Sequence, residues 1–201
     1  MRRRRWSSSN VPAEGTTQRT ERPATARVFF ALWPPSDVAQ QLSAVADSFA
    51  NSAGGRATRQ ETIHLTLAFI GNVPLERLPD LQRSAREVCA EAFDLTLDQF
   101  GLWHHNRVFW AGCSVVPPPL FELARALSGA LQAAGFDFAD ARRNFTPHVT
   151  LVRKVKVLGA PLPPGQTLPW RCTKFVLVRS QLSASGASYQ TLAEFSLSGR
   201  S

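Results

Sequence analysis

The sequence feature that most constrains this chain is a short motif that occurs twice, His64-Leu65-Thr66-Leu67 and His148-Val149-Thr150-Leu151. Each copy lies in a short run of apolar and β-branched residues, which is typical of a strand. Residues i and i+2 of a strand lie on one face, so each copy directs an imidazole and a hydroxyl the same way. If the two strands lie side by side, two imidazoles and two hydroxyls share one cleft.

Two histidines in one cleft suit a reaction in which one proton is removed and another is delivered. An unperturbed imidazole titrates near pH 6.5, roughly, so one ring can act as base while the other holds a proton. Hydrolysis of a phosphodiester fits this set, because hydroxyls and cations can bind the non-bridging oxygens. A metal site made from the histidines is the poorer alternative, since neither motif contains an acidic residue and the spacings match no metal signature. We therefore expect no metal and no cofactor.

Three cations lie close to the two motifs: Arg59 before the first, and Arg153 and Lys154 after the second. In a regular strand Arg153 has the opposite parity from His148, so its side chain would point away from the cleft, whereas Lys154 shares the parity of His148. A β-bulge or the end of the strand could redirect Arg153.

The order of predicted elements indicates an α+β fold built of two β-rich halves, each with one histidine strand, and with helices outside. The predicted elements are a strand at 27–32, a helix with Ser36 as its N-cap, a strand around His64 that ends at 71–74, a helix at 79–92, a single strand that includes 95–97 and 100–103, a turn at 104–106, its hairpin partner at 107–113, a helix that 117–119 opens and Gly135 ends, a strand around His148, a loop at 158–169 and a hairpin formed by 174–182 and 189–197.

The composition is that of an ordinary globular chain of 201 residues, with 44% hydrophobic and 19% charged residues. The formal net charge is +8, and residues 1–26 contribute six arginines against two glutamates, a net +4 (6 − 2). We interpret residues 1–26 as a disordered basic tail and residues 27–201 as a single bilobal domain. The basic body favours a polyanion such as nucleic acid as partner.

The three cysteines, Cys89, Cys113 and Cys172, are far apart and form no metal-binding pattern. Reduced thiols in a cytoplasmic protein are therefore expected. No apolar segment follows the N-terminal arginines as in a secretory signal, and no apolar run is long enough to span a bilayer. We expect a cytoplasmic monomer with no membrane partner.

With these residues assembled, the sequence resembles the 2H phosphoesterase superfamily, whose members carry a pair of H-x-[ST] motifs. The segments RVFFAL (27–32), ETIHLTLAFIG (61–71) and FTPHVTLVR (145–153) resemble the RNA 2′,3′-cyclic phosphodiesterase family within it, also called the 2′-5′ RNA ligase family. The resemblance implies a two-lobed fold with pseudo-two-fold symmetry, and antiparallel sheets that line a central cleft. It also implies metal-free hydrolysis of an RNA terminal 2′,3′-cyclic phosphate to a 2′-phosphomonoester, with tRNA fragments among the candidate substrates.

By position in the motifs, the resemblance makes His64 the proton donor and His148 the proton acceptor, with Thr66 and Thr150 as phosphate-binding hydroxyls. It also matches Arg153 to a basic residue near the phosphate. This conflicts with the parity argument, and we follow the resemblance.

Substrate-binding candidates complete the expected site. Arg59 and Lys154 are further cations, and the aromatic residues Phe30, Phe145 and Tyr189 are candidates to stack on a terminal base.

Other functions remain open from the sequence. The same chemistry in reverse would join RNA ends through a 2′-5′ bond. A related enzyme would cleave 2′-5′ oligoadenylate or small cyclic nucleotides, and a binding module would hold RNA in the cleft without turnover. A structural protein with two coincidental motifs is the fourth alternative.

Overall fold

The computed structural model describes residues 24–138, 145–183 and 186–198. The tail predicted over residues 1–26 lies outside these ranges except for its last three residues. Two of those three, Thr25 and Ala26, already belong to the first strand, so the ordered fold begins two residues earlier than predicted.

The described residues form α-helices, short 3₁₀ turns and strands that alternate along the chain. In order, they are β1 (Thr25–Leu32), α1 (Ser36–Ala53), β2 (Arg56–Ala57), η1 (Gln60–Thr62), β3 (Leu65–Pro74), η2 (Leu75–Arg77), α2 (Leu78–Arg86), β4 (Phe93–Leu97), β5 (Gln99–Trp103), β6 (Val108–Gly112), α3 (Pro118–Ala133), β7 (Val149–Arg153), β8 (Leu168–Cys172), β9 (Lys174–Ser183) and β10 (Gly186–Ser196).

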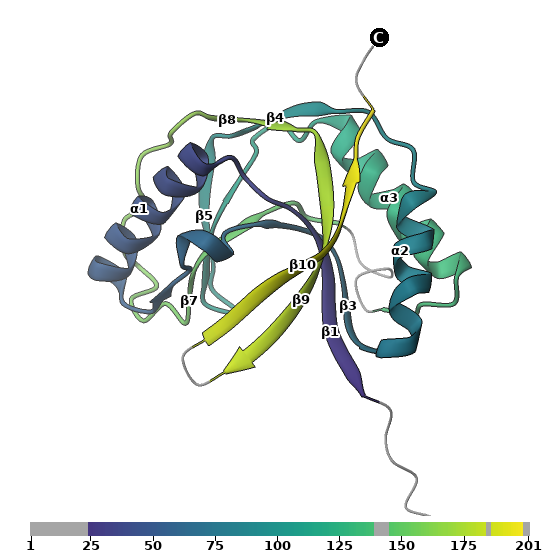
Figure 1. The fold of residues 1–201 in the computed structure, drawn as a ribbon. Helices are drawn as coiled ribbons and strands as arrows, with labels where there is room; N and C mark the ends of the chain where they lie inside the picture. The colour runs from purple at the N-terminus through teal and green to yellow at the C-terminus, as the bar shows by residue number, and fades with distance from the viewer. Residues whose placement is uncertain (1–23, 139–144, 184–185, 199–201) are drawn as a thin grey trace, which may run out of the picture.

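One antiparallel sheet organises the fold, with strand order β10-β9-β1-β3-β7-β6-β5 and with β2 paired to β7. The two motif strands, β3 and β7, are neighbours in the middle of this order. They join a lobe made of β10, β9, β1 and β3 to a lobe made of β7, β6, β5 and β2 (Figure 1). A separate two-stranded ladder, β4 with β8, lies along the top of the view in Figure 1. The predicted two-lobed, antiparallel α+β architecture is confirmed.

The helices lie outside the strands and connect the lobes crosswise. Helix α1 follows β1 in the chain but packs against β7, while α3 precedes β7 and packs against β3. Helix α2 packs beside α3, on the opposite side of the molecule from α1 (Figure 1). Each half of the molecule is therefore assembled from segments that lie far apart in the sequence, not from one contiguous half of it.

Strand β1 is buried on both faces and separates two apolar clusters. Val28, Phe30 and Leu32 face the main core beneath the helices, where each is 0% exposed. Phe29 and Ala31 face the other way, into a small cluster with residues of β9 and with aromatic side chains near His64. A strand buried on both faces is a continuous apolar run, as RVFFAL is.

Two helix boundaries differ from the prediction. Ser36 is the first residue of α1 and makes no capping hydrogen bond, because Pro35 occupies the N-cap position. The helix predicted over 79–92 ends at Arg86. The segment after it pairs with the C-terminal end of the chain instead: the Ala92 amide donates to the Ser198 carbonyl, and the Ser198 amide donates to the Ala90 carbonyl.

Two strands also differ from the prediction. Strand β3 continues through Gly71 to Pro74, because Gly71 adopts a φ of 86° and lets Ile70 bulge out of the ladder with β1. Strand β8 begins at Leu168, so Leu168 and Pro169 belong to a strand although they were predicted to lie in a loop. Among the strands that the structure describes, β8 pairs with β4 alone, and proline is tolerated in such an edge strand because it can lie where no ladder donor is needed.

Glycine substitutions test the packing of the sheet that carries the site. Gly101 of β5 lies opposite Trp110 of β6, and a Cβ at Gly101 would collide with the indole ring. We expect Gly101→Ala to lower the free energy of unfolding by about 1–3 kcal/mol in urea denaturation. The matched control is Gly129→Ala in α3, where a Cβ meets nothing within 4 Å and should stabilise the helix by about 0.5–1 kcal/mol. Equal effects at both positions would contradict the packing described.

Candidate active site

The two motifs meet at one backbone pair, Leu65 of β3 with Val149 of β7, and each is the central residue of its His-x-Thr motif. Continuing this antiparallel register by one residue in either direction sets His64 opposite Thr150 and Thr66 opposite His148. Directly opposed residues of antiparallel strands lie about 4.5–5.5 Å apart at Cα, with side chains on the same face. The fold thus brings the four predicted side chains together on one face.

Both imidazoles are held by the same local contact. The Nδ1–H of His64 donates to the carbonyl of Thr62 at 2.7 Å, and that of His148 donates to the carbonyl of Thr146 at 2.8 Å. A carbonyl oxygen can only accept, so Nδ1 carries the hydrogen in each ring. When either ring is neutral, Nε2 is therefore the nitrogen with the lone pair, and proton exchange takes place there.

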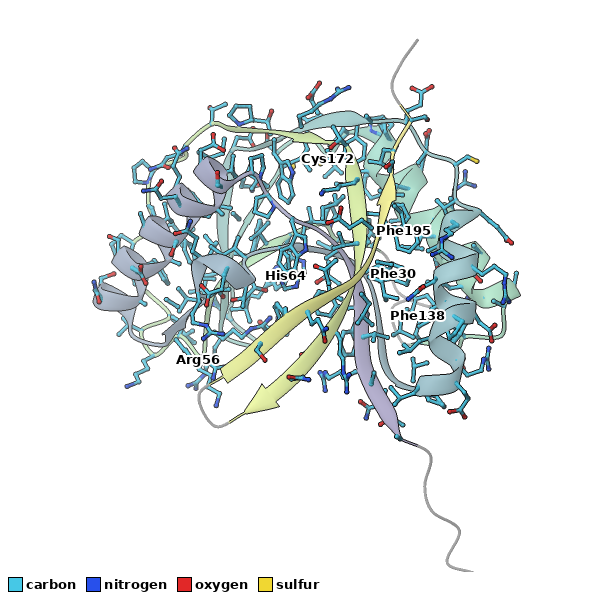
Figure 2. All side chains as sticks on the ribbon, viewed as in Figure 1. Phe30, Arg56, His64, Phe138, Cys172 and Phe195 are labelled. Carbon is cyan, nitrogen blue, oxygen red and sulfur yellow. The ribbon has the colours of Figure 1, made fainter. Side chains whose placement is uncertain are left out.

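The two imidazoles have different aromatic surroundings. The ring of His64 lies 4.8 Å from Phe29, 5.5 Å from Trp33 and 5.3 Å from Tyr189, measured between ring centroids. Figure 2 shows His64 near the centre of the view, above the β9–β10 hairpin. The ring of His148 meets Trp103 edge-on at 4.5 Å. Three aromatic side chains thus lie against the imidazole of His64, and Trp103 lies against that of His148.

These surroundings lower the pKa of His64 to about 4. Burial is the largest cause, because it disfavours the charged imidazolium, and the positive charges of Arg153 and His148 act in the same direction. The hydrogen bond to the Thr62 carbonyl opposes them but is outweighed. His64 is therefore neutral at pH 7.

A β-bulge in β7 decides where Arg153 points. Val152 pairs with Phe109 and Thr150 pairs with Trp110, so Leu151 is an extra residue in the ladder. Leu151 and Val152 are both buried, and the alternation resumes with Arg153 on the face of Thr150. The conflict with regular strand parity is thereby resolved, since the charge of Arg153 acts on His64. Lys154 is displaced by the same shift: it lies beyond the strand, exposed and with a φ of 58°.

The first motif contains the same bulge. Ala68 pairs with Phe30 and Thr66 pairs with Ala31, which leaves Leu67 as the extra residue. The counterpart of Arg153 is then Phe69, five residues after its histidine, and the guanidinium of Arg27 lies over the Phe69 ring at 4.8 Å. The pseudo-symmetry thus covers both the motifs and their bulges but not the side chain that follows.

Two predicted substrate-binding residues have other contacts. Phe30 is 0% exposed and packs against Phe175 and Phe195, so its ring is closed to a substrate and the prediction for it is wrong. Arg59 makes two contacts near the first motif. Its Nη2 donates to the Ala187 carbonyl of β10 at 2.7 Å, and its Nε lies 3.1 Å from the Glu61 carboxylate. Arg59 thereby ties the turn before His64 to the strand that carries Tyr189.

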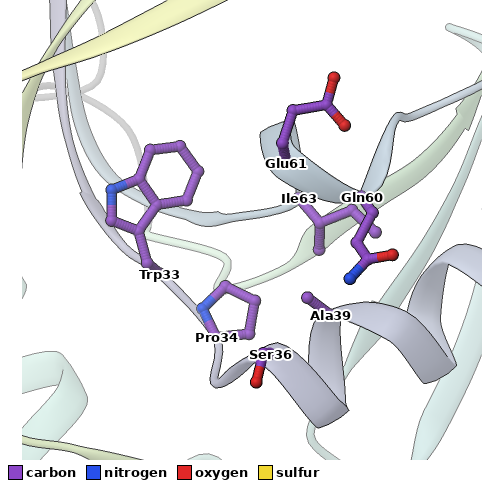
Figure 3. Close-up of a pocket in the computed structure, with 7 residues that line it drawn as sticks. All are labelled: Trp33, Pro34, Ser36, Ala39, Gln60, Glu61 and Ile63. Carbon is purple, nitrogen blue, oxygen red and sulfur yellow. The ribbon is translucent and has the colours of Figure 1, made fainter.

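One pocket includes two of the four motif side chains in its wall, and a second pocket is lined by residues next to the first motif. The larger, about 840 Å³, lies between β3 and α3 and includes Thr66, His148, Phe69 and Phe145 in its wall. The smaller, about 390 Å³, lies beyond Trp33. Figure 3 shows Trp33 and Pro34 on one side of this pocket, and Gln60, Glu61 and Ile63 on the other.

The sequence prediction missed the aromatic walls and the carbonyls that hold the rings. Trp33 and Trp103 contact the two imidazoles, and no sequence pattern links these residues to the motifs. The role of Thr62 and Thr146 could have been predicted from the sequence, because the repeated motif is longer than four residues. The pattern Thr-x-His-x-Thr-Leu occurs at 62–67 and again at 146–151.

Within residues 24–138, 145–183 and 186–198, no group of three or more His, Cys, Asp or Glu side chains is arranged to hold a metal ion. No helix in these ranges combines the length and apolarity needed to cross a bilayer.

Paired imidazoles with paired hydroxyls and an arginine beside them are the groups of an acid–base phosphoesterase. Comparison with known proteins agrees with this class. The profile described as LigT like Phosphoesterase matches residues 32–110. An RNA 2′,3′-cyclic phosphodiesterase of Escherichia coli K12 is 32% identical over 171 residues, which cover 85% of this chain and 96% of that protein. The chain belongs to the LigT-like phosphoesterase family.

Another relative and two solved structures extend the comparison. An RNA 2′,3′-cyclic phosphodiesterase of Thermus thermophilus is 31% identical over 86% of this chain and 91% of its own length. The structure of E. coli LigT complexed with 3′-AMP has a TM-score of 0.79 and 30% identity, covering 87% of this chain and 99% of that one. That of TT0787 from T. thermophilus has a TM-score of 0.76 and 27% identity, covering 87% of this chain and all of that one.

The electrostatic account of His64 can be tested by NMR titration of its imidazole. We expect a pKa of about 4 in the free protein. Arg153→Met removes a positive charge that opposes protonation, so the pKa of His64 should rise in this variant. Arg86→Gln, on the exposed face of α2, removes an equal charge away from the site and should leave the value unchanged. A pKa near 6.5 in the wild-type protein would contradict the account.

Proposed function

We propose that this protein hydrolyses the terminal 2′,3′-cyclic phosphate of RNA to a 2′-phosphomonoester, without a metal ion. The observation that carries the proposal is the pairing of Leu65 with Val149, which gathers two imidazoles and two hydroxyls on one face. The names of the relatives support the choice of substrate, because those of E. coli and T. thermophilus are RNA 2′,3′-cyclic phosphodiesterases.

In the proposed reaction the two histidines act on opposite sides of the phosphorus. The Nε2 of His148 takes a proton from a water molecule, whose oxygen attacks the phosphorus. The bond from phosphorus to the 3′ oxygen breaks, and the Nε2–H of His64 gives its proton to that oxygen. The products are a 2′-phosphate and a free 3′-hydroxyl, and each imidazole has exchanged one proton. These roles follow the resemblance of the two motifs to the family pattern.

In this mechanism His64 becomes protonated when the substrate binds, because the substrate raises the pKa of the imidazole. The pKa of about 4 belongs to the protein without substrate, where burial of the ring and the charge of Arg153 oppose protonation. A cyclic phosphate carries one negative charge and binds between the imidazoles, and a nearby anion raises the pKa of a histidine. The acid is therefore charged mainly when its substrate is bound.

In the proposed mechanism, the groups beside the histidines bind the phosphate. The hydroxyls of Thr66 and Thr150 donate to the non-bridging oxygens, and Arg153 neutralises the charge that grows on them as water attacks. The position of Phe145 in the wall of the larger pocket supports a role in holding the terminal base. Tyr189, edge-on to His64, borders the place where the ribose would bind.

The same proposal includes a single-domain monomer in the cytoplasm. The three cysteines support a reducing compartment, since all three are free thiols.

The reaction can be tested with an oligoribonucleotide that ends in a 2′,3′-cyclic phosphate, in the presence of EDTA. We expect complete conversion to a 2′-phosphate end. His64→Ala and His148→Ala should each lower kcat about 10²–10⁴-fold, because each removes a proton-transfer group. Thr150→Val, which loses the hydroxyl but keeps the shape, should lower kcat by a smaller factor.

His104→Ala is the matched control, because His104 lies exposed in the turn between β5 and β6. A 3′-phosphate product would show that the other oxygen leaves and would overturn the roles given to the two histidines. Tight RNA binding without turnover, equal in the wild type and in both histidine variants, would identify a binding module instead.

A further inference from the structure

A second arginine lies opposite Arg153. Strand β2 pairs with β7 so that Arg56 is the register partner of Arg153 and Ala57 is the partner of Val152. Val152 is in the main core, and Ala57 packs against that core. Directly opposed residues project from the same face. Arg56 therefore projects from the same face as Arg153, and this face carries the motif histidines and threonines.

Two arginines in this arrangement repel each other. Like charges directly opposite on antiparallel strands destabilise a sheet. Both side chains are exposed, and neither forms an ion pair with an acidic residue in the part of the chain that the structure describes. The nearby Glu61 is already engaged by Arg59. An anion between the two guanidinium groups would relieve the repulsion.

Other cations surround this end of the face. Val155 donates its backbone amide to the Arg107 carbonyl, and Lys156 packs on Gly54, next to β2. Arg107, Lys154 and Lys156 thus adjoin the Arg56–Arg153 pair. In Figure 2, Arg56 lies at the lower left margin of the molecule, below His64. The face therefore runs from the catalytic groups to a cationic end that opens to solvent.

We propose that Arg56 binds the RNA phosphate that lies immediately 5′ of the terminal nucleotide, while Arg153 binds the cyclic phosphate. The inference rests on the proposed function and adds a substrate preference to it. A guanidinium pairs with a phosphate through two parallel hydrogen bonds, and two opposed arginines can engage two successive phosphates of one strand. The enzyme then prefers an oligonucleotide, which has both phosphates, to a nucleoside 2′,3′-cyclic phosphate, which has one.

The test compares three substrates that end in the same uridine 2′,3′-cyclic phosphate. The first is the mononucleotide, the second is the dinucleotide with a normal internal phosphate, and the third is the dinucleotide with an uncharged methylphosphonate in its place. The wild type should have the highest kcat/KM on the second. Arg56→Gln should lower kcat/KM for the second substrate roughly tenfold more than for the first or the third.

Arg56→Lys, which keeps the charge but loses the two-bond geometry, should lie between the wild type and Arg56→Gln. The matched control is Arg86→Gln, which removes an exposed arginine of α2 and should leave the substrate ratios unchanged. Equal losses on all three substrates in Arg56→Gln, or a loss that persists with the methylphosphonate, would overturn the inference.

A binding measurement tests the role of Arg56 independently of the proposed reaction. A labelled dinucleotide that ends in a 2′-phosphate is not a substrate, and its affinity can be measured as a function of salt. In Arg56→Gln the slope of log affinity against log salt should fall by about 0.7, the value for one lost contact to a single strand. Absence of turnover by the wild type would refute the proposed function, whereas an unchanged slope would refute the role of Arg56.

Discussion

The pairing of Leu65 with Val149 is the contact on which the whole site depends. Side chains of a strand alternate between faces, so a slip of one residue at this pair would bury the histidine and threonine of one motif and expose its apolar residues. The register is held from outside the pair. Helix α1 packs against β7 and α3 packs against β3, so each motif strand is covered by a helix whose chain connection runs to the other lobe. The lobes cannot separate without exposing the core on both sides.

The paired bulges at Leu67 and Leu151 are the second constraint. A bulge shifts the alternation by one residue, so the fifth residue after each histidine joins the face of the motif. In one half this residue is Arg153, and in the other it is Phe69. The backbone geometry is thus the same in both halves, whereas the side chain at this position is an arginine in one half and a phenylalanine in the other. One end of the site is cationic, and the other leads into an aromatic-lined pocket.

The motif repeat was sufficient to predict the centre of the site. The period of two in a strand relates His64 to Thr66 and His148 to Thr150 without any knowledge of the tertiary structure, and the two copies imply that they meet. The fold class followed from the order of strands and helices. The bulges could not be predicted, because the parity argument assumes a regular ladder, and this is why the positions of Arg153 and Lys154 were difficult to assign.

Phe30 shows a different limit of sequence reasoning. The run RVFFAL contains no polar alternation, so nothing in it indicates which phenylalanine faces the core and which faces the cleft. In the structure Phe29 meets His64 while Phe30 is buried beside Phe175. Trp33 and Trp103 reach the site from strands or strand ends whose partners are distant in the chain. Their roles depend on tertiary contacts, and no local pattern encodes such contacts.

The aromatic and cationic surroundings of His64 oppose its protonation in two ways, by burying the imidazole and by placing a positive charge beside it. Phe29, Trp33 and Tyr189 lie against the imidazole and contribute to its burial, and Arg153 adds a positive charge beside it. An anion that enters the site removes both disadvantages, because it pairs with Arg153 and stabilises the imidazolium. The same low-dielectric surroundings then strengthen the attraction between the imidazolium and the phosphate. In the proposed mechanism, substrate binding and protonation of His64 are therefore coupled through one charge, and a neutral molecule in the same cleft would leave His64 without a proton to give.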